Sequence, residues 1–199
     1  MEGFSDGVFG FAITLLVIDI AIHPPGTPLQ QVLHAWPSYL AYVISFMTIG
    51  TAWLVHTAMT DQLAKVDPIF LRLNLLVLIV VVFLPFPTRL VADSLHDPSS
   101  QRVFVTMYGL TLLSIRLAGS ALDWYARDQQ LYAPRDDDDD LPSDRRKRTP
   151  LLIADAVAIA IGLAVPELAV ALYFGLAVYA IVPLREAARL LSRSRGSSQ

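Results

Sequence analysis

The sequence predicts an all-α integral membrane protein, and two observations predict this class: the composition and the length of the apolar runs. Of the 199 residues, 54% are hydrophobic and 17% are charged, and the mean hydropathy is +0.51. Soluble domains carry roughly a quarter of their residues as Asp, Glu, Lys or Arg. Many of the charges here are concentrated in Asp136–Asp140 and Arg145–Arg148. The rest of the chain is therefore poorer still in charge, and we expect most of it to lie in a lipid bilayer.

Six apolar runs suit membrane-spanning helices, because a helix rises about 1.5 Å per residue and needs about 20 apolar residues to cross the hydrocarbon core. They cover residues 4–22, 36–57, 69–92, 102–124, 150–165 and 167–184. The last two meet at Pro166, which cannot continue a helix, so they are predicted to form a tight helical hairpin. The first run has no basic residues before it and no small-residue cleavage site after it, so we expect a mature helix and not a signal peptide. The sequence thus predicts one six-span membrane domain over residues 1–199.

The distribution of Lys and Arg predicts the orientation, because basic residues resist translocation. With six spans, both termini and the even-numbered connections share one side. That side holds twelve Lys and Arg residues, against Arg89 and Arg102 on the other. We therefore expect a multi-pass protein of the cell membrane with both termini in the cytoplasm, a solvated cytoplasmic linker at 126–149 and a cytoplasmic tail at 185–199. The Asp run in the linker lacks the spaced ligands and Gly turn of a calcium loop.

Several classes of chemistry have no motif in this chain. The absence of Cys excludes disulfides, thiolate metal sites and a Cys nucleophile. There is no His-Glu-x-x-His, Gly-x-Ser-x-Gly or Gly-x-x-x-x-Gly-Lys, and the four His residues lie far apart in the sequence. No basic face with interleaved aromatic residues suggests nucleic acid. We therefore expect no enzyme activity, no cofactor and no nucleic-acid partner, and the sequence indicates no protein partner other than copies of the chain itself.

Charged side chains inside the predicted spans need a partner or a wet cavity, because each costs at least about 2.5 kcal/mol in hydrocarbon. Arg116 lies two turns outward of Asp123, and Asp155 starts the fifth span from the same side, so Arg116 is at a suitable depth to pair with either carboxylate. We expect such a pair to hold helices together. Alternatively, Asp19, Arg116 and Asp155 form a relay in a proton-coupled secondary transporter of a small solute. A scaffold protein without transport is a third interpretation.

The first run carries one apolar stripe when it is projected at 3.6 residues per turn. The stripe contains Gly7, Phe11, Thr14 with Leu15, Ile18 and Ile22. Periodicity alone allows two interpretations, an ordinary buried helix face or a hydrophobic constriction that gates a pore by dewetting.

The run Phe4–Ile20 opens with Phe-Ser-Asp, continues through Thr-Leu-Leu, and closely resembles the first-helix signature of the endolysosomal transmembrane potassium channel family and its prokaryotic members. Ile49–His56 resembles the second-helix Trp and His of that family, and Leu73–Leu76 with Phe83–Pro87 resembles its third helix. The resemblance is strongest over residues 4–92 and is only topological beyond them.

Two positions depart from the family pattern. The Arg that precedes the Phe-Ser-Asp motif in the family would fall before Met1, and the usual His-His pair is His56-Thr57 here. The resemblance implies a passive, leak-type, potassium-preferring channel whose first helix lines the pore, with potassium as the only metal ion. Family members with two repeats work as dimers, so a single-repeat chain implies a homotetramer. Four copies in a closed ring also place four equivalent stripes around one axis.

The resemblance also assigns roles to matching positions of the first helix. Phe11 aligns with the apolar residue of the inner constriction, Leu15 and Ile18 are neighbouring ring candidates, and Thr14 supplies hydroxyls for ion selectivity. A helix Thr bonded only to its own backbone is the alternative for Thr14.

Polar residues near the mouths of the predicted pore receive roles as well. The resemblance implies that Ser5 and Asp6 hydrogen-bond His56 and Asn74 and hold the first helix in place. A cytoplasmic acidic ring is the alternative for Asp6, and Asp19 is the candidate for an outer acidic ring.

Overall fold

The computed structural model describes residues 1–18, 20, 27–94, 98–133 and 145–181. The described chain is helical apart from short turns and one isolated bridge between Leu63 and Tyr132, and this confirms the all-α class. The helices are α1 (Glu2–Ile18), α2 (Pro28–His34), α3 (Trp36–Thr60), α4 (Pro68–Phe83), α5 (Pro85–Ser94), α6 (Pro98–Asp128), α7 (Arg145–Gly162) and α8 (Pro166–Ile181).

Three helical segments in the described chain are long and apolar enough to cross a membrane: Trp36–Thr60, Pro68–Ser94 and Ser100–Asp128. The apolar helices α1, with 17 residues, and α8, with 16, are shorter, and α7 is apolar only over Thr149–Gly162. Helices of this length and composition make the chain a multi-pass membrane protein.

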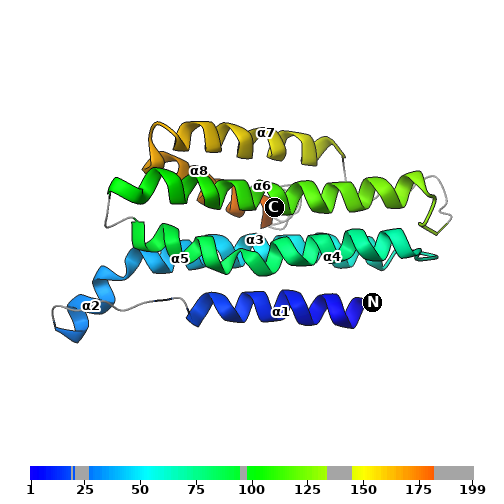
Figure 1. Cartoon of the computed structure of the whole chain (residues 1–199), viewed down its shortest axis with the longest axis horizontal. Coiled ribbons are helices and arrows are strands. Elements are labelled where there is room, and N and C mark those ends of the chain that lie inside the picture. Colours follow the sequence, from blue (N-terminus) through cyan, green and yellow to red (C-terminus); the bar gives the residue numbers. More distant parts are fainter. Residues whose placement is uncertain (19, 21–26, 95–97, 134–144, 182–199) are drawn as a thin grey trace, which may run out of the picture.

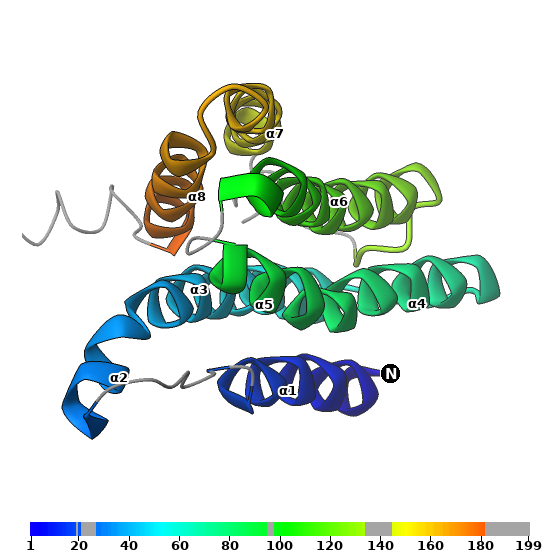
Figure 2. The same ribbon diagram turned by 60° about the vertical axis from the view of Figure 1, so that its left-hand side comes forward.

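The helices pack in three layers (Figures 1 and 2). The middle layer consists of α3, α4 and α5. On one side α1 packs alone against all three, and on the other side α6, α7 and α8 pack together. One face of α1 is consequently left without a neighbour in the described chain, which positions it for contacts outside the subunit.

The third predicted span is divided into two helices at Leu84. Neither Pro85 nor Pro87 has a backbone N–H, so the hydrogen-bond ladder cannot pass this point. The Leu84 carbonyl is still satisfied, because Thr88 donates both its backbone N–H, at 3.1 Å, and its hydroxyl, at 2.8 Å. The segment therefore continues in roughly the same direction as α5 (Figure 1).

A short helix that the apolar runs do not predict, α2, lies at one end of the bundle (Figures 1 and 2). The Thr27 side chain accepts from the backbone N–H of Gln30, the Gln30 side chain accepts from the backbone N–H of Thr27, and Pro28 occupies the first helical position. This capping box forms a helix from local signals without a long apolar run.

The hairpin of the last two helices turns earlier than the prediction placed it. Because Pro166 lacks an N–H that a first helical turn would leave unpaired anyway, it begins α8, and the turn comprises residues 163–165. The linker predicted at 126–149 is partly helical: α6 extends to Asp128, and α7 begins at Arg145. The Asp run of the linker and the tail at 185–199 lie outside the described residues.

A short backbone clamp ties the turn after α3 to the chain after α6. The Leu131 carbonyl accepts from the N–H groups of Ala64, at 2.9 Å, and Lys65, at 3.3 Å. Ala133 donates its N–H to the Gln62 carbonyl across 3.0 Å. The α3–α4 turn and the beginning of the linker are thus one structural unit.

Candidate functional site

The two faces of α1 have different surroundings. Ser5, Phe9, Ala12 and Leu16 are buried against the middle layer. The opposite face is exposed: Phe4 retains 62% of its accessible surface, Phe11 59% and Ile18 74%. In the monomer this apolar face has no cover from the described chain.

The stripe predicted in the first run lies on this exposed face. Gly7, Phe11, Thr14 and Ile18 are all exposed, whereas Leu15 is half-buried at the side of the stripe. A spacing of three and four residues keeps these positions on one side of the helix. The described chain does not bury Phe11 or Ile18, so the stripe faces lipid or another subunit. Asp19 and Ile22 lie outside the described residues.

Thr14 interrupts the exposed apolar stripe with a hydroxyl group. Its Oγ1 donates to the carbonyl of Phe11, three residues earlier, across 2.8 Å. Such back-bonding satisfies the hydroxyl proton locally. The oxygen still has lone pairs that can face a cation.

A buried polar chain joins α1, α3 and α4. His56 Nε2 and Asn74 Oδ1 are 2.7 Å apart, and Asn74 Nδ2 donates to Ser5 Oγ across 3.1 Å. All three residues are buried, and the His56 ring packs on Phe9 with 5.4 Å between ring centroids. Each polar group thus finds a partner on another helix, which fixes the rotation of α1 about its own axis.

Asp6 does not join this chain, contrary to the implication of the resemblance. Trp53 Nε1 donates to Asp6 Oδ1 across 2.8 Å, and both residues are exposed. Adjacent helix positions differ by about 100° in direction, so Asp6 cannot face the same partners as Ser5. The sequence alone did not indicate Trp53 as a polar partner, although an indole N–H is a hydrogen-bond donor.

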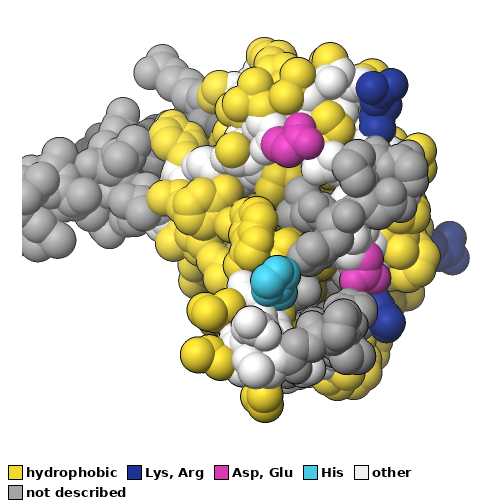
Figure 3. Space-filling model, turned by 90° about the vertical axis from the view of Figure 1, so that its left-hand side faces the viewer, with side chains coloured by type: hydrophobic (Ala, Val, Ile, Leu, Met, Phe, Trp, Pro, Cys, Tyr) yellow, Lys and Arg dark blue, Asp and Glu magenta, His cyan; other side chains and the backbone are white. Residues whose placement is uncertain are grey.

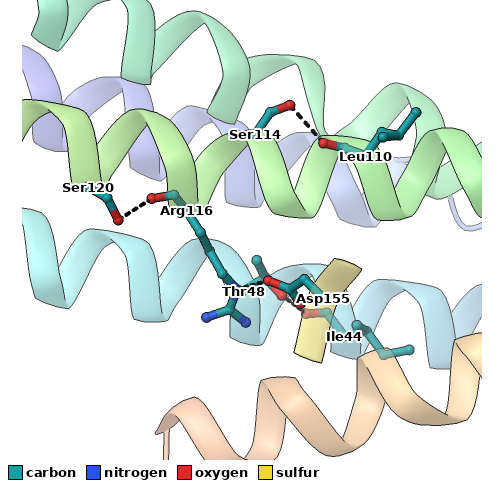
Figure 4. Close-up of polar contacts among 7 residues, drawn as sticks. All are labelled: Ile44, Thr48, Leu110, Ser114, Arg116, Ser120 and Asp155. Atoms are coloured by element: carbon teal, nitrogen blue, oxygen red, sulfur yellow. Dashed lines mark hydrogen bonds and ion pairs between the residues drawn. The ribbon is translucent and has the colours of Figure 1, made fainter. Parts of the chain in front are cut away.

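The intramembrane charges form two separate pairs. Arg116 on α6 and Asp155 on α7 approach to 2.6 Å between Nε and Oδ2, with side chains 17% and 1% exposed (Figure 4). Asp123 pairs instead with Arg127 one turn along α6, at 3.0 Å, and accepts from the Tyr132 hydroxyl. Of the two partners open to Arg116 in the sequence analysis, the structure shows Asp155.

A hydroxyl cluster in the opposite half of the bundle was missed by the sequence analysis. Ser45 Oγ lies 2.8 Å from both Thr88 Oγ1 and Tyr108 Oη, and all three residues are buried. They come from α3, α5 and α6, so the cluster is a second polar link between the middle layer and the outer helices. Hydroxyl residues inside apolar runs were the available signal.

Asp67 caps the N-terminus of α4, at the start of a segment long enough to cross a membrane. Its carboxylate accepts from the backbone N–H of Phe70 and from the hydroxyl of Tyr125, each at 2.7 Å. These two hydrogen bonds lower the pKa of the Asp67 carboxyl below its ordinary value of 3.8.

The described residues contain no group of three or more His, Asp or Glu that could hold a metal ion. The candidate functional site is the exposed face of α1, supported from behind by the polar chain of Ser5, Asn74 and His56. Apolar side chains also cover much of the surface around the α2 end of the bundle (Figure 3), as expected for a surface that faces lipid or another subunit.

Comparison with known proteins identifies the family that this chain matches. Residues 1–85 match the family described as endosomal/lysosomal potassium channel TMEM175. A potassium channel of Streptomyces collinus is 43% identical over 141 residues, which is 69% of this chain and 68% of that protein. The endosomal/lysosomal proton channel TMEM175 of Homo sapiens is 30% identical over 128 residues, 58% of this chain and 25% of that protein.

The fold agrees with a solved structure of the same family. A lysosomal potassium-selective channel TMEM175 homolog from Chamaesiphon minutus superposes with a TM-score of 0.76 at 32% sequence identity, covering 90% of this chain and 93% of that chain. Sequence identity of this extent confirms the resemblance noted in the first helix. The chain therefore belongs to the TMEM175 family, a family of ion channels and not of enzymes.

Proposed function

We propose that four copies of this chain form a passive, potassium-preferring channel whose pore is lined by the exposed face of α1. The observation that carries the proposal is that face itself: Phe11 and Ile18 remain 59% and 74% exposed, although the rest of the subunit packs behind them. Relatives named as potassium channels support the choice of ion. A channel of this kind needs no cofactor, and potassium is its only substrate.

The homotetramer rests on the resemblance to family members with two repeats that work as dimers, and the geometry of a pore is compatible with it. One helix cannot enclose a path, whereas four identical helices around an axis present four equivalent stripes to each other. Oligomers of identical subunits also mostly have closed symmetry. In such a ring the lone position of α1 on its side of the bundle becomes the central position of the assembly.

Successive rings of side chains along α1 have different roles in the proposed pore. Phe11 and Ile18 form apolar rings about 10 Å apart along the axis, at about 1.5 Å per residue, and constrict and dewet the path. Leu15 contributes to the constriction from the side of the stripe. Thr14 lies between these rings, and four Thr14 oxygens contact a partly dehydrated cation and favour potassium.

Behind the pore, the polar chain keeps the stripe aimed at the axis. A rotation of α1 by one residue would turn Phe11 away by about 100° and break the bonds of Ser5 to Asn74 and of Asp6 to Trp53. Asp19, beyond the described end of α1, forms an acidic ring at the outer mouth that concentrates cations.

The topology that goes with this pore has six spans, α1, α3, α4 with α5, α6, α7 and α8, in the cell membrane, with both termini in the cytoplasm. The excess of Lys and Arg on one side of the predicted spans supports the orientation. The Arg116–Asp155 pair holds α6 against α7 in this arrangement.

Flux into liposomes tests the proposal. Purified protein is reconstituted, and potassium, sodium and N-methylglucamine gradients are imposed on the same preparation. Potassium flux above sodium flux, with little flux of the large cation, is expected. Absence of flux at every imposed voltage contradicts the channel, and saturable uptake that requires a proton gradient indicates the proton-coupled transporter instead.

A further inference from the structure

A cavity of about 350 Å³ lies inside each subunit, apart from the α1 face. Its walls come mainly from α3, α6, α7 and α8, with Val77 of α4 and Tyr132, and are mostly apolar. Leu54 belongs to its wall and is 54% exposed, so the cavity communicates with the surface of the chain. Volumes of this order, apolar walls and a few polar groups are typical of ligand-binding sites.

Among the described residues that line the cavity, Arg116 is the one with a formal charge, and its guanidinium group marks the charged end of the cavity. Only its Nε approaches Asp155, and the two terminal nitrogens point away from that carboxylate (Figure 4). In the described part of the chain, no oxygen accepts a hydrogen bond from either terminal nitrogen. A guanidinium group has five N–H donors, and the four on the terminal nitrogens have no acceptor here, which is costly in an apolar cavity. An occupant with an oxygen acceptor would satisfy them.

The charge of the site selects among such occupants. Asp155 already neutralises Arg116 at 2.6 Å. A second anion would leave the buried group with a net negative charge, which an apolar environment disfavours. A cation would be repelled by Arg116. The site therefore favours an uncharged head group.

Hydroxyl groups at this end favour a head group that also donates. Ser120 and Thr48 line the cavity, and they donate their own hydroxyl protons to the carbonyls of Arg116, at 2.7 Å, and Ile44, at 2.9 Å (Figure 4). Their oxygens keep lone pairs and can act only as acceptors toward a ligand. An alcohol can accept from Arg116 and donate to one of these oxygens.

We propose that this cavity binds an uncharged amphiphile with an alcohol head group at Arg116 and an apolar chain along α3, α6 and α8. At about 30 Å³ for a group the size of a water molecule, the cavity holds a ligand of roughly ten to twelve non-hydrogen atoms. A decanol-sized molecule has these dimensions. No residue of α1 lines the cavity, so the test of this proposal does not need ion flux.

Photolabelling tests the proposal in the reconstituted full chain. The probe is a decanol that carries a diazirine in its chain, with labelled peptides identified by mass spectrometry. We expect label on peptides of α3, α6 or α8 that line the cavity, and we expect decanol to compete at least tenfold better than decane of the same chain length. Absence of label from these peptides, or equal competition by the two compounds, overturns the proposal.

Variants with a filled cavity test whether the photolabel binds there. A Cβ added at Gly119 meets no atom within 4 Å, so Gly119→Leu extends into the cavity without a clash at its base. We expect it to lower labelling about tenfold, a loss of about 1.4 kcal/mol. Gly175→Leu is the matched control, because Gly175 has equally open surroundings and does not line the cavity. Ala52→Phe fills the cavity from α3 and provides a second test if Gly119→Leu does not fold. Undiminished labelling of a folded filled variant contradicts the site.

The contribution of the head group is tested separately. Replacing a buried ion pair by apolar residues is often tolerated, so the double variant Arg116→Met with Asp155→Leu is suitable. We expect this variant to retain labelling and to lose the preference for decanol over decane. A retained preference would refute the assignment of the alcohol to Arg116.

Discussion

Asn74 donates its side-chain amide to the hydroxyl of Ser5 across 3.1 Å, which links the middle of α4 to the first turns of α1. The two residues are 69 positions apart in the sequence, and both are at most 2% exposed. Because the same Asn74 also bonds His56 on α3, one side chain sets the relative position of three helices.

Replacement of Asn74 by Ala should destabilise the subunit by about 1 to 3 kcal/mol, because His56 and Ser5 would be left buried without partners. Thermal unfolding of the detergent-solubilised protein measures the effect as a lower Tm. Thr51→Ala is the control, since the Thr51 hydroxyl bonds only the carbonyl of Met47 in its own helix. Equal losses of Tm in the two variants would contradict the role of the polar chain.

Gly109 is predicted to tolerate no side chain. A Cβ at this position would overlap the Tyr173 hydroxyl and approach Tyr173 Cζ to 2.7 Å and Ile159 Cγ1 to 2.8 Å. Gly109→Ala should therefore cost about 1 to 3 kcal/mol by overpacking. Gly50→Ala, with no atom within 4 Å of its new Cβ, should leave Tm unchanged or raise it. Adding Tyr173→Phe to Gly109→Ala should restore part of the loss, and a Gly109→Ala variant as stable as the parent would refute the contact.

Phe11→Ala should raise potassium flux severalfold in liposomes. The substitution removes four phenyl groups from the proposed constriction, which becomes wider and wetter. Ile79→Ala on α4 is the matched control: Ile79 is 65% exposed, and no pore role is proposed for it. Unchanged flux in Phe11→Ala, or an equal increase in both variants, would assign Phe11 to packing between subunits.

Thr14→Ala should lower the ratio of potassium to sodium flux. An oxygen contact contributes about 1 kcal/mol, so the expected loss in the ratio is roughly fivefold. Thr14→Ser keeps the hydroxyl and should keep the ratio. Selectivity that survives in the Ala variant would show that the Thr14 hydroxyl serves only its bond to Phe11.

The pH dependence of stability should reveal the cap at Asp67. Its pKa is lower in the folded protein than the ordinary 3.8, so the carboxylate stabilises the fold above that pH, and the contribution is lost as the pH falls through the lowered folded value. Asp67→Asn keeps a capping side chain but cannot ionise. We expect the Tm difference between parent and variant to be largest near neutral pH and to shrink below about pH 4. A difference that does not vary with pH would contradict this account.

The helices could be predicted from the sequence because long apolar runs can form few other structures in a membrane. The Arg116–Asp155 pair could be predicted for a related reason, because depth in the bilayer limits which charged side chains can meet. Choice between Asp155 and Asp123 depended on how α6 and α7 face each other, and periodicity on one helix does not contain this information.

The remaining contacts depend on helix rotation or on local capping. Asp6 and Ser5 are neighbours in the sequence but bond different helices, so the Trp53 contact required the packed structure. The short helix α2 was within reach, because Thr-x-x-Gln at Thr27 is a capping-box pattern that a search for apolar runs passes over.

The clamp between residues 62–65 and 131–133 has an evolutionary consequence. It joins the half of the chain that matches the family description, residues 1–85, to the half beyond it. Its hydrogen bonds are made by the main chain, which every residue type except proline can supply in full. The exposed side chains at Ala64, Lys65 and Ala133 can vary while the two halves stay joined, and proline at any of these three positions is the substitution that selection should remove.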